Sequence, residues 1–399
     1  MRKEVYWLWS VMIFGIGSSS LWKAGAGFDD ICEFCNELSE GRISGVSDKV
    51  RERLEKYSYD HAERILEECD SRELSYVCYD DEEYPKRLKD IASPPAMLFY
   101  RGSLDALSGK LIAVTGAREA CEKSLEICDR LCSDLVKNDV SLMSGFAGGV
   151  DQLVNSVCIR EGARTVAVLA GPVDEDHPKG SGDLKREVWE KGIVISEYYP
   201  GSKRNVHSFV DRNRISVGLS DGVLFIEASP ESHGLDNYSQ AVYQGKPVFV
   251  VPPMDIFDER FAGQSMLLRR GCVGVYGAED ILRVLSEDQQ YEVLSQPWLY
   301  TSQAKKSVRK TEKSTKAVSE KKVKGTNIPK YEKPPRPPYD PKAWGEKSAR
   351  LYEIISKKPT SVDELTRMTG IPTFDVLAEL MTLELEGYVK SLPGRIYTV

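Results

Sequence analysis

Glycine-rich turns and basic side chains recur at the ends of short apolar runs in the middle of the chain. VTGAR places Arg118 two residues after Gly116, and SGFAGGVD places Gly145, Gly148 and Gly149 before a helical segment. Glycine allows a sharp turn and close approach of the backbone to a ligand. Successive amides at a helix start bind anions, and an arginine beside them can meet a phosphate bidentately. These residue types indicate phosphate binding.

The segment HSFVDRNRISVGLS adds two guanidinium groups and an aromatic ring. Arg212 and Arg214 flank Asn213, and Phe209 stands shortly before them. An aromatic ring beside cations can stack on a nucleic-acid base. Because residues two apart on a helix point in different directions, we expect only one of the two arginines to meet the ligand.

Two more segments contribute polar groups after apolar runs. HPKG contains Lys179, and IEASPESHGLDN enters a helix through Ser232 and Gly234. Each turn alone is as typical of packing as of binding, but five such segments on one sheet edge indicate a site. Asp151, after the glycines, is expected to cap a helix. The four histidines are scattered and no carboxylate pair or metal cluster is present, so we expect no catalytic centre.

The elements that position these residues are strands and helices in alternation. The apolar runs LIAVTG, DVSLMSG, RTVAVLAG, GIVISE, GVLFIEA and KPVFVV are separated by amphipathic segments such as CEKSLEICDRLCSDLVKN. Continuous apolar strands that alternate with helices predict a parallel sheet covered on both faces. The fold class is therefore α/β, with an extended, doubly wound, Rossmann-like sheet. Ligands of such sheets bind outside the carboxyl ends of the strands.

The 399 residues divide into four expected parts. They are a helical domain (SAM-like or helix-hairpin-helix-like) at 1–79, the Rossmann-like domain at 80–290, a flexible Lys- and Pro-rich linker at 291–347 and a winged helix at 348–399. The first domain has a single lysine after its Gly-x-Gly turn, which favours packing or oligomerisation over contact with nucleic acid. Between the first two parts, Pro85, Pro94 and Pro95 exclude regular helix from an ordered connector.

Charge is distributed unevenly along the chain. The net charge is −7, but Thr301–Lys347 holds twelve Lys and two Arg against five acidic residues, a net +9, which leaves −16 on the rest. Any nucleic-acid site on the folded part must therefore be a local basic pocket. The lysines of the linker favour a solvated tether over a second DNA-binding segment.

The cysteines and the first residues of the chain indicate the cellular compartment in which the protein works. Nine scattered cysteines are typical of a reducing, cytoplasmic setting. Cys32 and Cys35 have a zinc-like spacing, but no second pair completes a metal site. The apolar run near the start is shorter than the roughly 20 residues of a membrane span, so we expect a packed helix and no membrane contact.

The order of these motifs resembles the DNA-processing protein A (DprA/Smf) family. The family's motifs are, in chain order, GSR, SGxAxGID, YPK, SEYPPG, FxxRNRIIxGLS, VxEA, SGSLITA, VxAVPG and GxNxLIxxGA. The corresponding segments of this chain are, in the same order, TGAR, SGFAGGVD, HPK, SEYYPG, FVDRNRISVGLS, LFIEA, SHGLDNY, VFVVPP and GQSMLLRRGC. The chain departs from the pattern in SHGLDNY, at Asn155 in place of histidine and at Ser265 in place of asparagine. These departures concern the pocket beside Ser232 more than the basic groove.

The resemblance implies a homodimer that binds single-stranded DNA without catalysis and helps to load the RecA recombinase during natural transformation. No cofactor is expected. The residues implied at the DNA backbone are Arg118, Lys179, Arg212 and Arg214, with Phe209, Lys203 and Arg204 beside them.

Two other functions remain open. The related nucleoside-monophosphate phosphoribohydrolases use a PGGxGT loop followed by a catalytic glutamate, whereas SHGLDN here lacks adjacent glycines and that glutamate. A winged helix can read DNA through its second helix. In TFDVLAELMTLELEG that helix carries four acidic residues and no basic one, so we expect it to contact protein instead; the acids are Asp375, Glu379, Glu384 and Glu386.

Overall fold

In the computed structural model, the residues described are 1–204, 208–286 and 346–371, with 375–377, 379–380, 383, 388–392 and 396–398. The chain forms two compact units, Met1–Lys313 and Ser314–Val399, which are treated separately. The expected linker lies outside the described residues except for Glu346 and Lys347, which begin a helix.

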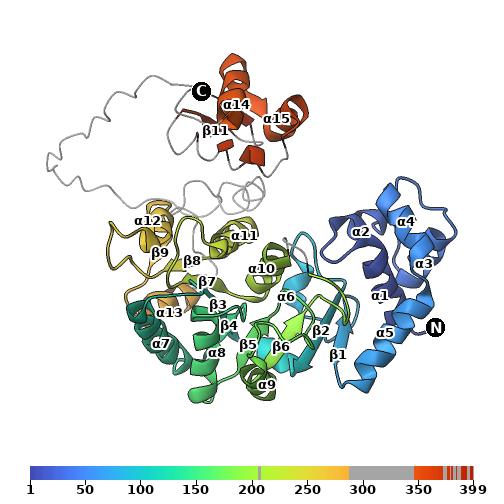
Figure 1. Cartoon of the computed structure of the whole chain (residues 1–399), viewed down its shortest axis with the longest axis horizontal. Helices are drawn as coiled ribbons and strands as arrows, with labels where there is room; N and C mark the ends of the chain where they lie inside the picture. Colours follow the sequence, from blue (N-terminus) through green and yellow to red (C-terminus); the bar gives the residue numbers. More distant parts are fainter. Residues whose placement is uncertain are drawn as a thin grey trace, which may run out of the picture. The chain divides into compact units, whose positions relative to one another are not determined.

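A nine-stranded sheet forms the centre of the first unit (Figure 1). The strands are β1 Ser75–Cys78, β2 Met97–Gly102, β3 Lys110–Thr115, β4 Val140–Ser144, β5 Thr165–Val168, β6 Ile193–Ser196, β7 Gly222–Phe225, β8 Val248–Val250 and β9 Val273–Gly274. Their order is β1-β2-β6-β5-β4-β3-β7-β8-β9, and neighbours from β6 to β9 are parallel. The six strands expected from the apolar runs are β3 to β8, which confirms the doubly wound α/β fold.

Three strands of this sheet were not expected: β1, β2 and the two-residue β9. β1 and β2 pair antiparallel with each other, and β2 pairs antiparallel with β6 at the edge of the sheet. β1 lies inside the range assigned to the helical domain, and β2 follows directly on the prolines of the connector. Because a proline before a strand removes no ladder hydrogen bond, Pro94 and Pro95 exclude helix there without excluding the strand.

Helices cover both faces of this sheet (Figure 1). One face holds α7 Glu122–Val136, α8 Val150–Arg160, α9 Gly182–Lys191 and α13 Ala278–Ser286, and the other holds α6 Lys86–Lys89, α10 Ser208–Leu219, α11 Asp236–Gln244 and α12 Ala262–Arg269. Short 3-10 turns are η1 Leu104–Leu107, η2 His233–Leu235 and η3 Glu259–Phe261. Along β3, Ile112 packs on the α7 side and Ala113 on the α10 side. This two-sided burial explains why the strands are continuously apolar.

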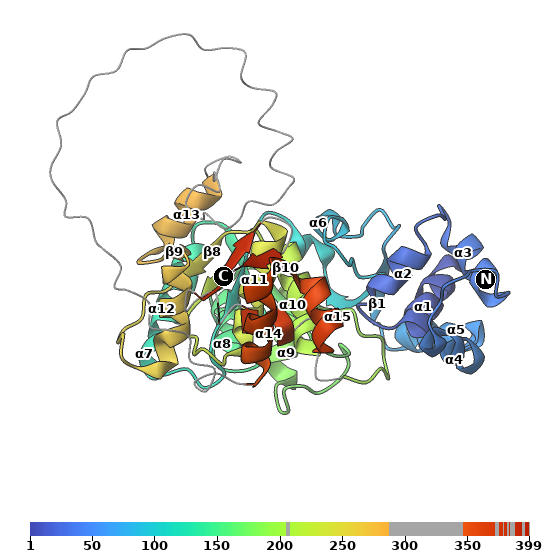
Figure 2. The same ribbon diagram turned by 90° about the horizontal axis from the view of Figure 1, so that it is seen from above.

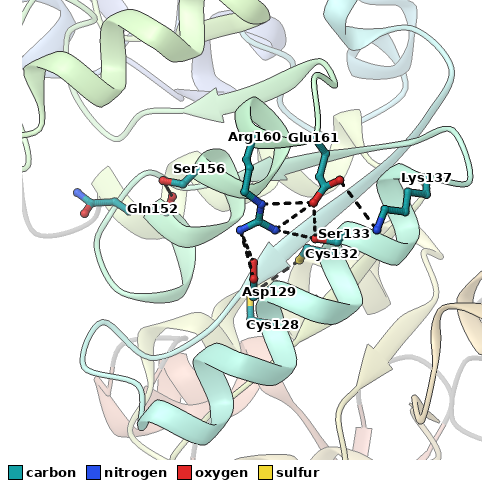
Figure 3. A network of polar contacts seen from close by, with 9 residues as sticks. All are labelled: Cys128, Asp129, Cys132, Ser133, Lys137, Gln152, Ser156, Arg160 and Glu161. Carbon is teal, nitrogen blue, oxygen red and sulfur yellow. Dashed lines mark hydrogen bonds and ion pairs between the residues drawn. The ribbon is translucent and has the colours of Figure 1, made fainter.

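A polar network fixes the end of α8 to α7 (Figure 3). Arg160 pairs with Asp129 at 2.7 Å, and Ser133 donates a hydrogen bond to Glu161 at 3.0 Å. Arg160 also donates to the hydroxyl of Ser133 at 2.8 Å. The C-terminal end of α8 is therefore held in register, which fixes its N-terminal end at the carboxyl edge of the sheet.

The N-terminal helices pack around one apolar helix (Figure 2). They are α1 Lys3–Phe14, α2 Ser19–Ala24, α3 Ile31–Ser39, α4 Asp48–Lys56 and α5 Tyr59–Ser71. Trp7–Phe14 is buried throughout, and the core around it continues into Phe99 of β2 and Val194 of β6. The apolar run at the start is thus a packed helix. Among the described residues no helix is long and apolar enough to cross a membrane.

The second unit has the helices and strands of a winged helix. They are α14 Glu346–Lys357, α15 Val362–Thr369 and a three-stranded sheet in the order β10-β12-β11, with β10 Thr360–Ser361, β11 Lys390–Leu392 and β12 Ile396–Thr398. Of the four acidic residues noted in the sequence, Asp375 pairs with Lys347 at 2.6 Å, and Glu379 accepts a hydrogen bond from Ser348. Glu384 and Glu386 lie outside the described residues.

Candidate phosphate-binding site

The glycine-rich segments meet at the carboxyl edge of the parallel strands. β3 ends before Gly116, β4 before Gly145 and β5 before Gly171, and these three strands are neighbours in the sheet. Because parallel strands end at the same edge, the loops that follow them lie side by side.

Gly116 and Gly149 allow the first two loops to touch. A methyl group on Gly116 would overlap the side chain of Val150, and one on Gly149 would overlap the carbonyl groups of Ala117 and Arg118. Gly149 also has φ +55°, a conformation that favours glycine. The amide of Val150 donates to the carbonyl of Ala117 at 3.3 Å, which joins the turn after β3 to the start of α8.

The start of α8 presents backbone amides. Gly149 is the N-cap of this helix, so the expectation that Asp151 would be the cap is wrong. Asp151 instead lies buried in the first turn and accepts from the amide of Ala147 at 3.2 Å. The amides of Gly148 and Gly149 have no acceptor among the described residues. At a helix N-terminus, such amides form an anion site.

Phe146, between Gly145 and Gly148, has a strained backbone. Its φ is +54°, which is uncommon for a residue with a side chain. Its ring is fully buried in the core that the N-terminal helices share with the sheet. Its amide donates to the hydroxyl of Ser144 at 3.1 Å. Burial of the ring therefore holds the turn in the shape that exposes the following amides.

Arg118 and Phe209 come together beside these amides. The Arg118 guanidinium lies 5.3 Å from the centre of the Phe209 ring, which is 6.3 Å from the ring of His177. Arg118 is exposed and forms no ion pair with a carboxylate in the parts of the chain that the structure describes. A narrow pocket beside the two rings is lined by Gly145, Phe146, Ala147, Gly171, His177 and Phe209. Arg118 is thus a cation available to a ligand, and its orientation is set by an aromatic face.

The loop after β5 supplies further polar groups. Lys179 is exposed. His177 is partly buried, and this burial together with the charges of Arg204 and Arg118 lowers the pKa of its imidazole. The buried Lys185 of α9 holds this loop by donating to the carbonyl groups of Val173, at 3.1 Å, and of Glu175. The buried lysine therefore positions the loop that carries His177 and Lys179.

Lys203 and Arg204 lie on the same side of the site. Arg204 pairs with Glu175 at 3.1 Å, and its aliphatic chain packs against Gly171. Lys203 is exposed. Both therefore border the loop of Lys179, with Lys203 the more accessible cation.

The structure contradicts the expected role of Arg212. Its side chain is buried beneath Gly145 and donates to the carbonyl of Val168 at 2.5 Å. Burial lowers the pKa of this guanidinium, and the nearby carboxylate of Asp151 opposes that effect. Arg212 therefore supports the floor of the site and does not reach the surface where a phosphate would bind.

Arg214 is also not a backbone contact. It forms two hydrogen bonds of 2.7 Å to the two oxygens of Glu197, and both side chains are buried. Burial raises the pKa of Glu197, and the charge of Arg214 opposes this. All residues from Arg212 to Ser220 are buried, because α10 lies between the sheet and other elements. The expectation that one of the two arginines meets the ligand is therefore wrong.

The remaining expected residues lie deeper or to one side. Asn213 is buried and lines an inner polar pocket with Thr115, Ser216 and Asn237. Gly234 lies close to Thr115, and the Ser232 hydroxyl accepts from the amide of Gly234 at 3.3 Å. These residues border the site on the β7 side without adding a cation.

Sequence reasoning missed Glu197, His177 and Lys185. Glu197 was read only as part of SEYYPG, and the histidine only as one of four scattered ones. A buried ion pair between residues far apart in sequence has no local signal. The closest available signal was a glutamate directly after the run IVIS of a central strand, a position where a charge needs a partner.

Fold and site together define a Rossmann-like protein with a basic, glycine-lined candidate site for phosphate and a winged helix that follows it in the chain. Residues 75–286 match the model of DNA recombination-mediator protein A, and residues 333–395 match the DprA winged helix domain. Since the first match covers more than half of the chain, the protein belongs to the DNA recombination-mediator protein A (DprA/Smf) family.

Relatives in several bacteria agree. Protein Smf of Synechocystis is 27% identical over 406 residues, covering 99% of this chain and 98% of the relative. The DNA processing protein DprA of Streptococcus pneumoniae is 32% identical over 202 residues, covering 51% of this chain and 71% of the relative. The X-ray structure of DNA processing protein A from Streptococcus pneumoniae superimposes with a TM-score of 0.60 at 25% identity, over 71% of this chain and 98% of that one.

Proposed function

We propose that this protein binds single-stranded DNA, with little sequence preference, along the carboxyl edge of its sheet. The observation that carries the proposal is the grouping in one place of exposed Arg118, the Phe209 ring and the amides of Gly148 and Gly149, which have no acceptor in the described part of the chain. Lys179 and Lys203 extend the basic surface over the neighbouring loops. Family membership supports DNA as the ligand, because the matched family is one of recombination mediators.

Each group has a distinct part in such binding. The guanidinium of Arg118 and the amides at the start of α8 hold one phosphate, and Lys179 neutralises a second. Phe209 offers a ring face on which a base can stack. Contacts of this kind read phosphates and ring faces rather than base edges, so they do not discriminate between sequences.

A polymer fits better than a free nucleotide. Arg118, Lys179 and Lys203 are exposed and belong to different loops, so their charges are spread along an edge. A mononucleotide site would instead gather its cations and polar groups inside one cavity. The inner polar pocket at Thr115 contains the buried guanidinium of Arg212, which is already bonded to a backbone carbonyl.

Binding without catalysis is supported by the carboxylates near the site, which are engaged in structural contacts. Glu227 accepts from the amide of Cys121 at 3.1 Å, Glu175 pairs with Arg204, and Asp151 is buried against Arg212. None of these is poised to take a proton from a substrate. We therefore place the protein among binding proteins rather than nucleotide-processing enzymes.

The wider role that we propose is delivery of single-stranded DNA to a RecA-type recombinase in DNA uptake and recombination, by a cytoplasmic homodimer. All nine cysteines are free thiols, which supports a reducing compartment. We assign DNA binding to residues 80–290, protein contacts to the winged helix at 348–399 and a tether to 291–347. The remaining residues, 1–79, form the helical domain.

The test is a mobility-shift titration with single- and double-stranded oligonucleotides of several sequences. We expect the wild-type protein to prefer single strands and to bind different sequences within about threefold, since backbone contacts carry the affinity. The variant Arg118→Ala with Lys179→Ala should bind single-stranded DNA at least about tenfold more weakly than the wild type. Equal binding by this variant would show that the edge is not the DNA site, and release of free base from nucleotides would favour an enzyme.

A further inference from the structure

We propose that the N-terminal helical domain sets the shape of the DNA groove, the surface bordered by Arg118, Phe209 and the loop that carries Lys179, with Gly17 and Glu197 as positioning residues. This inference rests on the proposed binding of single-stranded DNA. The helical domain contacts both segments that flank the groove, the helix that carries Phe209 and the loop that carries Lys179. Its own basic residues need not touch DNA.

The first contact joins the Gly15–Gly17 turn to the end of β6. The amide of Gly17 donates to Glu197 at 3.2 Å, and the same carboxylate accepts both hydrogen bonds from Arg214. A methyl group on Gly17 would lie 3.5 Å from the Arg214 guanidinium and 3.9 Å from the side chain of Asp211. The turn therefore packs directly on the first turns of α10.

α10 connects this contact to the groove. Arg214 and Asp211 face the N-terminal turn, while Phe209 contacts Arg118 and Arg212 supports Gly145. These residues belong to two successive turns of one helix, so they move together. A shift of the helix at Gly17 therefore changes the place of the Phe209 ring and of the groove floor.

The second contact reaches the opposite side of the groove. Arg72, at the C-terminal end of α5, pairs with Asp174 at 2.6 Å. Asp174 lies in the loop after β5, three residues before His177. The core is shared as well, because Phe146 packs in the same apolar cluster as α1. The helical domain thus holds the groove through three contacts: at Glu197, at the loop after β5 and in the shared apolar core.

This arrangement predicts a particular pattern of binding. A positioning residue changes affinity without changing the number of phosphates that the protein neutralises. Its replacement should therefore weaken DNA binding and leave the slope of log affinity against log salt unchanged. A direct phosphate contact changes both.

The experiment compares Gly17→Leu and Glu197→Gln in the full chain with Gly41→Leu as the matched control. Gly17 and Gly41 both have φ +71° in the same domain, so the backbone strain is alike. A Cβ at Gly17 already lies in van der Waals contact with Arg214 and Asp211, so the larger side chain must displace α10, whereas no atom lies within 4 Å of a Cβ at Gly41. Affinity for a single-stranded oligonucleotide is measured at four salt concentrations, with hydrogen exchange of the α10 amides.

We expect Gly17→Leu and Glu197→Gln to bind about three- to tenfold more weakly, with the wild-type salt slope and faster exchange in α10. Gly41→Leu should bind within about twofold of the wild type. If Glu197→Gln does not fold, Gly17→Leu, which lies outside the sheet, decides the question. Wild-type affinity in Gly17→Leu would overturn the inference. Arg118→Ala in the same series separates the two claims, because its unchanged binding would overturn the proposed function instead.

Discussion

At the scale of single residues, the role of a basic side chain here depends on whether a carboxylate or carbonyl already holds it. Arg118 and Lys179 are exposed and lack a carboxylate partner in the described part of the chain. Arg214 is neutralised by Glu197, and Arg212 is bonded to a strand carbonyl. Breaking the buried pair would leave an uncompensated charge at a cost of about 3–5 kcal/mol, so DNA cannot recruit Arg214 readily.

His177 gives the site a dependence on pH. Its pKa lies below the ordinary 6.5 because of burial and the charges of Arg204 and Arg118, with Glu175 opposing. The imidazole is therefore uncharged above pH 7 and becomes protonated as the pH falls. A bound phosphate favours the charged form, so DNA affinity should rise between pH 7.5 and 5.5, by up to about tenfold for each pKa unit by which DNA raises it.

The stability of the DNA-free protein should decrease as the pH falls, whereas DNA affinity should increase. Because the folded-state pKa of His177 is lowered, this group destabilises the fold as the pH falls below 6.5. Fluorescence titrations with single-stranded DNA at several pH values measure the predicted change in affinity, and His177→Gln is the control. A pH dependence that persists in the glutamine variant would assign it to another group.

At the scale of elements, the strands β3 to β8 could be predicted because their continuous apolar runs alternate with amphipathic segments. β1, β2 and β9 could not, since β1 follows a helical stretch, the prolines before β2 obscured the pattern and β9 has only two residues. The glycine turns of the site were predictable from local chemistry. The burial of α10 was not, because RNRIS reads as an exposed basic segment until its partners Glu197 and Val168 are known.

Gly145 and Gly148 look alike in the sequence but differ in their surroundings. A methyl group on Gly145 would overlap the Arg212 guanidinium, whereas one on Gly148 meets no atom within 4 Å. We expect Gly145→Ala to cost about 1–3 kcal/mol of unfolding free energy through overpacking. Gly148→Ala should stay within about 0.5 kcal/mol of the wild type.

Thermal or urea unfolding of the two variants measures this difference. The comparison controls for helix propensity, because both substitutions are Gly→Ala in the same turn. Equal stability of the two variants would mean that Arg212 can leave its place under Gly145 at little cost, and that the floor of the site is mobile.

At the scale of the whole molecule, we propose that the first unit binds DNA and the second contacts protein. The first unit has its own cores and contains every residue of the candidate site. In the second unit, Asp375 and Glu379 are engaged with Lys347 and Ser348 within the winged helix. These contacts shape the domain rather than a DNA surface.

Removal of residues 346–399 should therefore leave DNA binding in place. We expect single-strand affinity within about threefold of the full chain at matched salt, because the phosphate contacts are unchanged. A mobility-shift titration of the shortened chain checks this. A loss of tenfold or more would place part of the DNA site in the winged helix.

The salt dependence of single-strand binding tests the central claim most directly. Each neutralised phosphate contributes about −0.7 to the slope of log affinity against log salt. Arg118→Ala with Lys179→Ala should therefore flatten the slope by about 1.4 and weaken binding. The matched control is Arg164→Ala with Lys191→Ala, which removes the same charge from exposed residues at the opposite edge of the sheet. The account predicts a flattened slope only in the first variant; equal slopes in both variants would contradict it.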